Sequence, residues 1–166
     1  MTLVGTGGVG KTTLARAVVA RAGPAPPDGA HWIDLAPLRV GERLLPLVAH
    51  ALGVSFDTAD PDTDELVSAL APLSALMVLD NCEHLLDEAM ALLGPLLQRA
   101  PGLRWLATSH EPLHVAGETV YRLGPLDLPP PDVSPALALQ SGAVALFCER
   151  ARAADRLFEL SSERVD

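Results

Sequence analysis

Lysine, cysteine and long apolar runs are scarce in this sequence. Its 166 residues include one lysine, Lys11, and two cysteines, Cys82 and Cys148. Two cysteines are too few for a disulfide scaffold or a CxxC metal pair, which suits a protein of the reducing cytosol. Pro72 and Ser74 interrupt the longest apolar run, so no run approaches the roughly 20 residues that span a bilayer. The N-terminus also lacks the basic and apolar segments of a secretory signal, so we expect a cytoplasmic protein without membrane contact.

Positive charge is also in short supply. Lysine and arginine together number 12 against 21 acidic residues, so the net charge is −9. A protein that follows a nucleic-acid backbone needs the opposite balance, because clustered Lys and Arg side chains provide its affinity for phosphates. We therefore expect no direct contact between this segment and nucleic acid.

Apolar residues, by contrast, make up 49% of the sequence and charged residues 20%, which is the composition of a folding chain. Short apolar runs alternate with longer stretches of helical periodicity, a pattern typical of a buried parallel sheet with helices packed on it. The predicted fold class is therefore α/β. Strands are expected at 1–4, 31–35, 75–79, 103–108 and 119–123. Helices are expected at 11–22, 42–52, 83–99 and 141–155, and from an N-cap at Asp60 to the residues before Pro72.

The strongest motif lies between the first expected strand and the first expected helix. Residues 5–12 read GTGGVGKT and match G-x-x-x-x-G-K-[ST] at every fixed position, although a glycine-rich turn could match by chance. Glycines let successive backbone N–H groups turn inward around a phosphate at a helix N-terminus. Lys11 would add a charge for the β- and γ-phosphates, and the Thr12 hydroxyl would bind Mg²⁺. The expected nucleotide-binding residues are Gly5, Thr6, Gly7, Gly8, Val9, Gly10, Lys11, Thr12 and Thr13.

A second signal follows the third expected strand. The apolar run at 76–79 delivers Asp80 to the edge of the sheet, where its carboxylate would hold Mg²⁺ together with Thr12, usually through water. This is the Walker B pattern. Asp80 or Asn81 could instead cap the next helix, because Asp80-x-x-Glu83 has the spacing of a capping box. The P-loop motif upstream favours the magnesium role.

Polar residues also end the fourth expected strand. Thr108, Ser109 and His110 stand where a side chain could sense a γ-phosphate. An ordinary strand ending before Glu111 and Pro112 explains the same residues equally well.

Several segments, in this order and spacing, resemble a known family. They are LVGTGGVGKTTLARAV, HWIDLAPL, LMVLDNCEHLLDE, LRWLATSHEPLHVAGE, YRLGPLDLP and AVALFCERARAAD. Over nearly its whole length the chain resembles the NB-ARC-type nucleotide-binding domain of STAND signalling ATPases. It is most similar to the ATPase modules of large bacterial transcriptional regulators of the AfsR and LuxR type, in which LDNCEHL and TS-x-EPL-x-V-x-GE recur.

The resemblance implies a three-layer P-loop NTPase fold with a parallel five-stranded sheet in the order 5-1-4-3-2, and an ATP/ADP switch that uses Mg²⁺. Residues 108–110 would then face the γ-phosphate. Family members usually carry arginine at the position of His110, and many relatives carry a second acid at that of Asn81. Both differences predict slow or partner-dependent ATP hydrolysis, with Glu83 as a substitute base. The catalytic candidates are Lys11, Asp80, Glu83 and His110.

Five prolines at 124–135 indicate a stiff linker. We expect a P-loop core at 1–123, the linker at 124–135 and a C-terminal helical segment at 136–166 that leads to a missing lid domain. Because the family's lid and winged helix are absent, the chain looks like the nucleotide-binding core of a larger regulator, or a truncated remnant. The expected partners are adenine nucleotide, the regulator's other domains and further copies in a homo-oligomer. The alternative function is a nucleotide-binding oligomerisation module that does not hydrolyse ATP.

Overall fold

The computed structural model describes residues 1–21, 23–56 and 61–160, and the chain divides into two units. The first unit runs from Met1 to Leu123 and contains the sheet and helices α1 to α4. The second unit begins at Gly124 and contains helices α5 and α6. No helix in the described ranges combines the length and the apolar character that a membrane crossing requires.

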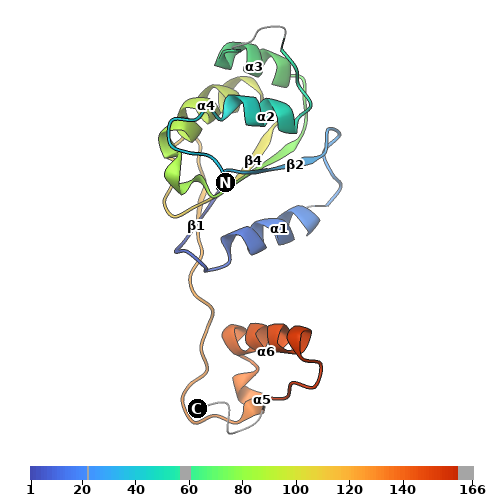
Figure 1. Ribbon diagram of the computed structural model, residues 1–166, viewed down its shortest axis with the longest axis vertical. Helices are drawn as coiled ribbons and strands as arrows, with labels where there is room; N and C mark the ends of the chain where they lie inside the picture. The colour runs from blue at the N-terminus through green and yellow to red at the C-terminus, as the bar shows by residue number, and fades with distance from the viewer. Residues whose placement is uncertain (22, 57–60, 161–166) are drawn as a thin grey trace. The chain divides into compact units, whose positions relative to one another are not determined.

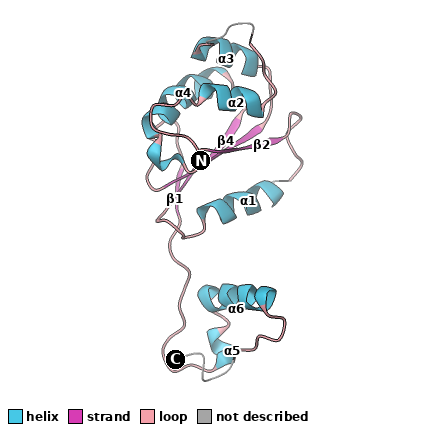
Figure 2. Cartoon of the chain, in the orientation of Figure 1, coloured by secondary structure: helices cyan, strands magenta, loops and turns pink. Residues whose placement is uncertain are grey.

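A parallel sheet of five strands forms the centre of the first unit, and its strands are drawn in magenta in Figure 2. The strands are β1 (Thr2–Val4), β2 (Ala30–Asp34), β3 (Leu76–Asp80), β4 (Arg104–Ser109) and β5 (Val120–Arg122). Their spatial order is β2-β3-β4-β1-β5, and every neighbouring pair is parallel. This is the expected 5-1-4-3-2 order counted from the other edge, so the predicted fold class is confirmed.

Helices cover both faces of the sheet (Figure 1). Helix α1 (Lys11–Arg21) packs on one face, and α2 (Leu45–Ala51), α3 (Thr63–Leu70) and α4 (Leu86–Arg99) pack on the other. Two separate apolar clusters hold these layers together. The smaller one, under α1, consists of Leu3, Ala15, Val78 and Leu106.

The continuous apolar sequence of β3 follows from this three-layer arrangement. Side chains alternate between the two faces along a strand. Val78 belongs to the cluster under α1, whereas Met77 and Leu79 belong to the cluster on the opposite face, and all three are buried. A strand covered on both faces therefore needs apolar residues at every position.

Parallel pairing brings the carboxyl ends of the strands to one edge of the sheet. Val4 lies opposite Ser109, and Asp34 lies opposite Asp80. The segments that leave these strands therefore start close together, which is where ligands bind in open α/β sheets.

Helix α2 begins at Leu45, three residues later than the predicted start at position 42. Pro46 lies in its first turn. Proline has no amide hydrogen, so it cannot bond to the carbonyl of Glu42 four residues earlier, and the helix does not extend back. The preceding segment is a turn in which the amide of Arg39 donates to the Glu42 carboxylate at 3.1 Å.

Helix α3 begins at Thr63, and Asp62 is its N-cap. The amide of Glu65 donates to the Asp62 carboxylate at 2.8 Å, and the amide of Asp62 donates to the Glu65 carboxylate at 3.1 Å. These two bonds form a complete capping box. The predicted N-cap, Asp60, lies outside the described residues, and the structure gives the capping role to Asp62.

Helix α4 was predicted to begin at Glu83, but the chain first makes a 3₁₀ turn, η1 (Cys82–His84), and the α-helix starts at Leu86. Asn81 has a left-handed backbone with φ of 65°, which interrupts any helix running back to Asp80. Neither the cap of η1 nor that of α4 makes a side-chain capping bond. The capping alternative for Asp80 and Asn81 therefore finds no support in the fold.

The second unit contains a short helix, α5 (Pro135–Ala138), and a longer one, α6 (Gly142–Ala154). The proline-rich segment before α5 packs against the start of α6. The amide of Ala143 donates to the carbonyl of Asp127 at 3.1 Å, and a Cβ on Gly142 would lie 3.4 Å from a methyl group of Leu126.

Candidate functional site

The loop between β1 and α1 needs its glycines for two different reasons. Gly8 and Gly10 have φ values of 77° and 103°, which residues with a side chain rarely adopt. Gly5 is needed for space, because a Cβ there would lie 2.7 Å from the carbonyl oxygen of Leu123. Residues 6–8 are exposed, so a ligand can reach the loop at the N-terminus of α1.

Lys11 is the first residue of α1, and its side chain folds back over this loop. Its Nζ donates to the carbonyl of Gly5 at 2.8 Å and to that of Thr6 at 3.1 Å. An ammonium group has three N–H donors, so two are used in holding the side chain in place. The lysine is only 8% exposed, and its charge is thereby held at the loop.

Asp80, the last residue of β3, is bonded to two other elements. Thr12 on α1 donates from Oγ1 to Asp80 Oδ1 at 2.9 Å, across 68 residues of sequence. Thr108 on β4 donates its hydroxyl to the same oxygen. Asp80 is 3% exposed. The two predicted magnesium ligands, Thr12 and Asp80, are therefore in direct contact.

The chemistry of this pair suits a magnesium ion. A hydroxyl and a carboxylate are oxygen donors, which Mg²⁺ prefers. Within the described ranges, no group of three His, Cys, Asp or Glu side chains is arranged to hold a metal ion. Mg²⁺ bound by Thr12 and Asp80 would take its other ligands from phosphate and water, which is usual for this ion beside a nucleotide.

The other two catalytic candidates also lie together beside the loop. His110 Nε2 is 3.5 Å from Glu83 Oε1, and a Cβ on Gly7 would lie 3.8 Å from the same nitrogen. The second carboxylate oxygen of Glu83, Oε2, is buried and has no hydrogen-bond partner in the described part of the chain. A buried acceptor without a donor is unfavourable, so Glu83 can gain from a bound donor such as water.

Two residues near the site have no evident part in it. Thr13 is exposed on the first turn of α1. Cys82 is buried, and desolvation, together with the charges of Glu83 and Asp80, raises the pKa of its thiol to about 12. A thiol with so high a pKa stays protonated and is a poor nucleophile, which agrees with a packing role.

Sequence reasoning missed the contact between Thr108 and Asp80. The sequence offers Thr108 either as a phosphate sensor or as part of an ordinary strand ending, and in the structure its hydroxyl donates to the carboxylate of Asp80 on the neighbouring strand. Leu79 lies opposite Ala107, and this register places the following residues, Asp80 and Thr108, side by side. The order of the strands suggested their proximity, but the register that aligns them is a tertiary property.

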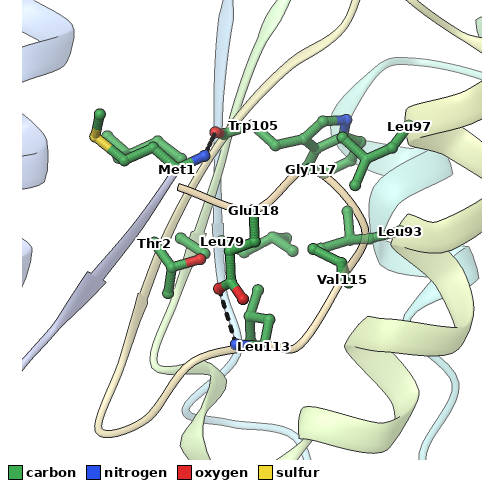
Figure 3. Close-up of a pocket in the computed structure, with 12 residues that line it drawn as sticks. Met1, Thr2, Leu79, Leu93, Leu97, Trp105, Leu113, Val115, Gly117 and Glu118 are labelled. Carbon is green, nitrogen blue, oxygen red and sulfur yellow. Dashed lines mark hydrogen bonds between the residues drawn. The ribbon is translucent and has the colours of Figure 1, made fainter. Parts of the chain in front are cut away.

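A separate cavity lies between the sheet and α4 (Figure 3). Its lining includes Leu93, Leu97 and Trp105, and no residue from positions 5–13. Glu118 is an acidic residue at its wall, where burial opposes ionisation. Hydrogen bonds from Thr2 and from two backbone amides outweigh this effect and lower the pKa of Glu118. Because no residue of the P-loop lines it, this cavity is distinct from the candidate site.

Known proteins that are similar to this chain in sequence include the following three. It is 38% identical over 151 residues to a protein of Mycobacterium tuberculosis provisionally named an HTH-type transcriptional regulator, covering 91% of this chain and 16% of that protein. It is 32% identical over 163 residues to an uncharacterized protein of Mycobacterium bovis, covering 98% of this chain and 39% of that protein. It is 39% identical over 116 residues to the regulatory protein AfsR of Streptomyces griseus, covering 64% of this chain and 11% of that protein. The chain thus spans a minor part of each relative, and no family model matches it.

Solved structures share its architecture. The TM-score is 0.57 with a chain of Drosophila ORC bound to DNA, at 19% identity over 74% of this chain and 37% of that one. It is 0.53 with Cdc6p of Pyrobaculum aerophilum, at 21% identity over 75% of this chain and 38% of that one. It is also 0.53 with a STAND protein with a tetratricopeptide-repeat sensor from Pyrococcus horikoshii, at 18% identity over 95% of this chain and 23% of that one. The chain has a P-loop NTPase fold.

Proposed function

We propose that this chain is an Mg·ATP/ADP-binding switch module of a STAND-type signalling or transcriptional regulator, with slow ATP hydrolysis. The observation that carries the proposal is the hydrogen-bonded contact between the P-loop segment and Asp80. The lone lysine is held over the loop carbonyls, and the next residue, Thr12, bonds to Asp80 Oδ1 at 2.9 Å. A chance glycine-rich turn has no reason to be joined to a buried carboxylate 68 residues away.

Each site residue has a distinct part in this proposal. The amides of residues 5–12 and the Lys11 ammonium bind the phosphates, while Thr12 and Asp80 hold Mg²⁺. The ion supplies charge neutralisation at the phosphates. Glu83 orients a water molecule and accepts its proton, and His110 lies beside the γ-phosphate.

Slow hydrolysis follows from the two departures from the family pattern. Asn81 cannot act as a second acid, and its side chain donates to Asp34 Oδ1 at 2.9 Å. Position 110 carries histidine, whereas arginine would supply a permanent charge and bidentate donors. Charge stabilisation by an arginine accounts for a large part of the rate in fast P-loop enzymes.

The similar proteins support a place within a larger regulator. Their names include an HTH-type transcriptional regulator and AfsR, and the chain spans 16% and 11% of those two proteins. We infer that the segment is the nucleotide-binding part of such a protein. Its partners are then the other domains and further copies, and its net charge of −9 leaves DNA contact to other segments.

Nucleotide binding is tested by replacing Lys11 with alanine. Lys11→Ala removes the ammonium group that the loop carbonyls hold in place, so ATP affinity should fall about 10- to 100-fold. Isothermal titration calorimetry with ATP and ADP, in the presence of Mg²⁺, measures the change.

Arg21→Ala is the matched control, because it removes one positive charge from the last turn of the same helix. Its affinity should match that of the unaltered chain. Correctly folded protein that gives no heat with either nucleotide would contradict the proposed function.

A second candidate is a nucleotide-binding oligomerisation module that does not hydrolyse ATP. Asn81 favours it, because the position directly after Asp80 carries an amide, bonded to Asp34, instead of a second acid. Phosphate release distinguishes the two functions: release at the background level from a chain that binds ATP supports the second candidate.

A further inference from the structure

Four hydrogen bonds connect the ends of three strands with α1. Thr12 and Thr108 both donate their hydroxyl protons to Oδ1 of Asp80. The backbone amide of Asn81 donates to Thr108 Oγ1 at 3.0 Å, and its side-chain amide donates to Asp34 Oδ1 at 2.9 Å. The bonded residues come from β2, the end of β3, β4 and α1.

Simple chemistry sets the direction of these bonds. A backbone N–H can only donate, so the Thr108 oxygen accepts from Asn81 and directs its single proton to Asp80. Thr108 is 0% exposed and Asp80 is 3% exposed, so water does not readily replace either partner. The orientation of the Asp80 carboxylate therefore depends on a hydroxyl from the neighbouring strand.

The backbone conformation of Asn81 places the amide that donates to Thr108. Its φ of 65° and ψ of 52° are left-handed, a conformation that glycine and asparagine adopt more readily than other residues. This turn lets the amide of Asn81 bond to Thr108 just before the chain enters η1. The bond to Asp34 anchors the side chain of the same residue.

We propose that Thr108 is a positioning residue for the magnesium site. By donating to Oδ1 it holds the Asp80 carboxylate in one orientation and leaves Oδ2 for the ion and its water. The left-handed amide of Asn81 acts through Thr108 by fixing the direction of that hydroxyl. This inference rests on the proposed Mg·nucleotide function, and it assigns Thr108 to the metal rather than to the γ-phosphate.

The rival role for Thr108 is direct contact with the γ-phosphate. A phosphate contact would change ATP affinity whether or not Mg²⁺ is present, and would leave ADP affinity unchanged. A positioning role would weaken both nucleotides only when Mg²⁺ is present. Affinities for ATP and ADP, each measured in Mg²⁺ and in EDTA, therefore separate the two roles.

The experiment compares Thr108→Val with Thr108→Ser. Valine matches the shape of threonine but has no hydroxyl, whereas serine keeps the hydroxyl. We expect Thr108→Val to lose about 10- to 100-fold in Mg²⁺-dependent nucleotide affinity, because a bond to a charged group is removed. Its affinity in EDTA should not change, and Thr108→Ser should restore the response to Mg²⁺.

Thr2→Val is the control for loss of a buried threonine hydroxyl from the neighbouring strand, β1. Thr2 is 2% exposed, and its hydroxyl bonds to Glu118, away from the candidate site. This variant should keep the Mg²⁺ response of the unaltered chain. An equal loss of Mg²⁺ response in Thr2→Val, or a loss of affinity in EDTA in Thr108→Val, would overturn the positioning role.

Substitutions of Asn81 test the second half of the inference. Asn81→Gly keeps the left-handed backbone and its amide, so the Mg²⁺ response should be retained. Asn81→Ala disfavours that backbone and should weaken the response, and equal behaviour of the two variants would contradict this step. If the unaltered chain binds neither nucleotide, the proposed function fails; if it binds Mg·ATP and Thr108→Val binds it equally well, the positioning role alone is overturned.

Discussion

His110 carries its ring to within 3.5 Å of the Glu83 carboxylate, beside the backbone of Gly7. Arginine at this position would be charged at every physiological pH, whereas a histidine can be neutral. The buried Oε2 of Glu83 has no partner in the described residues, so this carboxylate has capacity for a further donor. We therefore assign the proton-accepting part of the proposed reaction to Glu83.

Glu83→Gln should retain nucleotide binding and lose phosphate release. Glutamine has nearly the same shape but cannot accept a proton, and general-base catalysis typically contributes roughly 100-fold or more to a rate. Single-turnover phosphate release should therefore fall about 100-fold, with nucleotide affinity little changed.

Asp87→Asn is the control, because it removes one exposed carboxylate from the first turn of α4. Its rate of phosphate release should equal that of the unaltered chain. Undiminished release from Glu83→Gln would show that another group accepts the proton.

At the scale of elements, the loop between β4 and β5 is closed by its last acidic residue. The final Glu118 of TSHEPLHVAGE turns its carboxylate back to accept from the amides of Leu113 and His114, each at 2.9 Å, and Figure 3 shows the first of these bonds. His114 has a φ of 57°. Leu113 is buried in the larger apolar cluster. The carboxylate of Glu118 thus closes this loop on itself, and Leu113 anchors the loop in the apolar cluster on the sheet face that α4 covers.

Glu118→Gln should lower the free energy of unfolding by about 1 kcal/mol at pH 7, because the bonds to its charge are partly open to solvent. The pKa of Glu118 lies below its ordinary value in the fold. Ionised Glu118 therefore stabilises the fold at pH values above its pKa in the unfolded chain. This stabilisation disappears as the pH falls through its lower pKa in the folded protein. Urea unfolding at neutral and acidic pH should show the difference shrinking in acid.

Glu111→Gln is the control, since Glu111 is an exposed acid of the same loop. It should change stability little at either pH. The assigned bonds would be contradicted if the free energies of unfolding of Glu118→Gln and the unaltered chain differed more in acid than at neutral pH.

Element boundaries show where sequence patterns succeed and fail. The apolar run of β3 was placed to within one residue, because burial on both faces leaves a continuous signal. The start of α4 was placed three residues too early, at position 83 rather than at Leu86. The left-handed Asn81 and the 3₁₀ turn depend on contacts with β2 and β4, which no local pattern contains.

At the scale of the whole molecule, the proposed site lies within the first unit. Lys11, Thr12, Asp80, Glu83 and His110 all precede the boundary after Leu123. The five strands and the clusters that cover both sheet faces also belong to this unit. The second unit therefore contributes no candidate site residue.

A fragment of residues 1–123 should fold and bind nucleotide with an affinity within about threefold of the full chain, which is less than 1 kcal/mol. Its own sheet and apolar clusters supply the packing that a separate unit needs. Calorimetric titration compares the nucleotide affinities of the fragment and the full chain, and urea unfolding compares their stabilities. A fragment that folds but binds far more weakly would assign the second unit a part in the site.

The sequence alone determined the fold class and the strongest site candidates, because the GTGGVGKT spacing and the alternation of apolar runs are local properties of the chain. Lys11, Thr12 and Asp80 could be named in this way. Only the tertiary structure decided that Thr108 bonds to Asp80 and that a 3₁₀ turn precedes α4. The physical reason is that strand register and the pairing of distant hydroxyls and carboxylates arise when strands align, and that alignment is set by packing across the whole sheet.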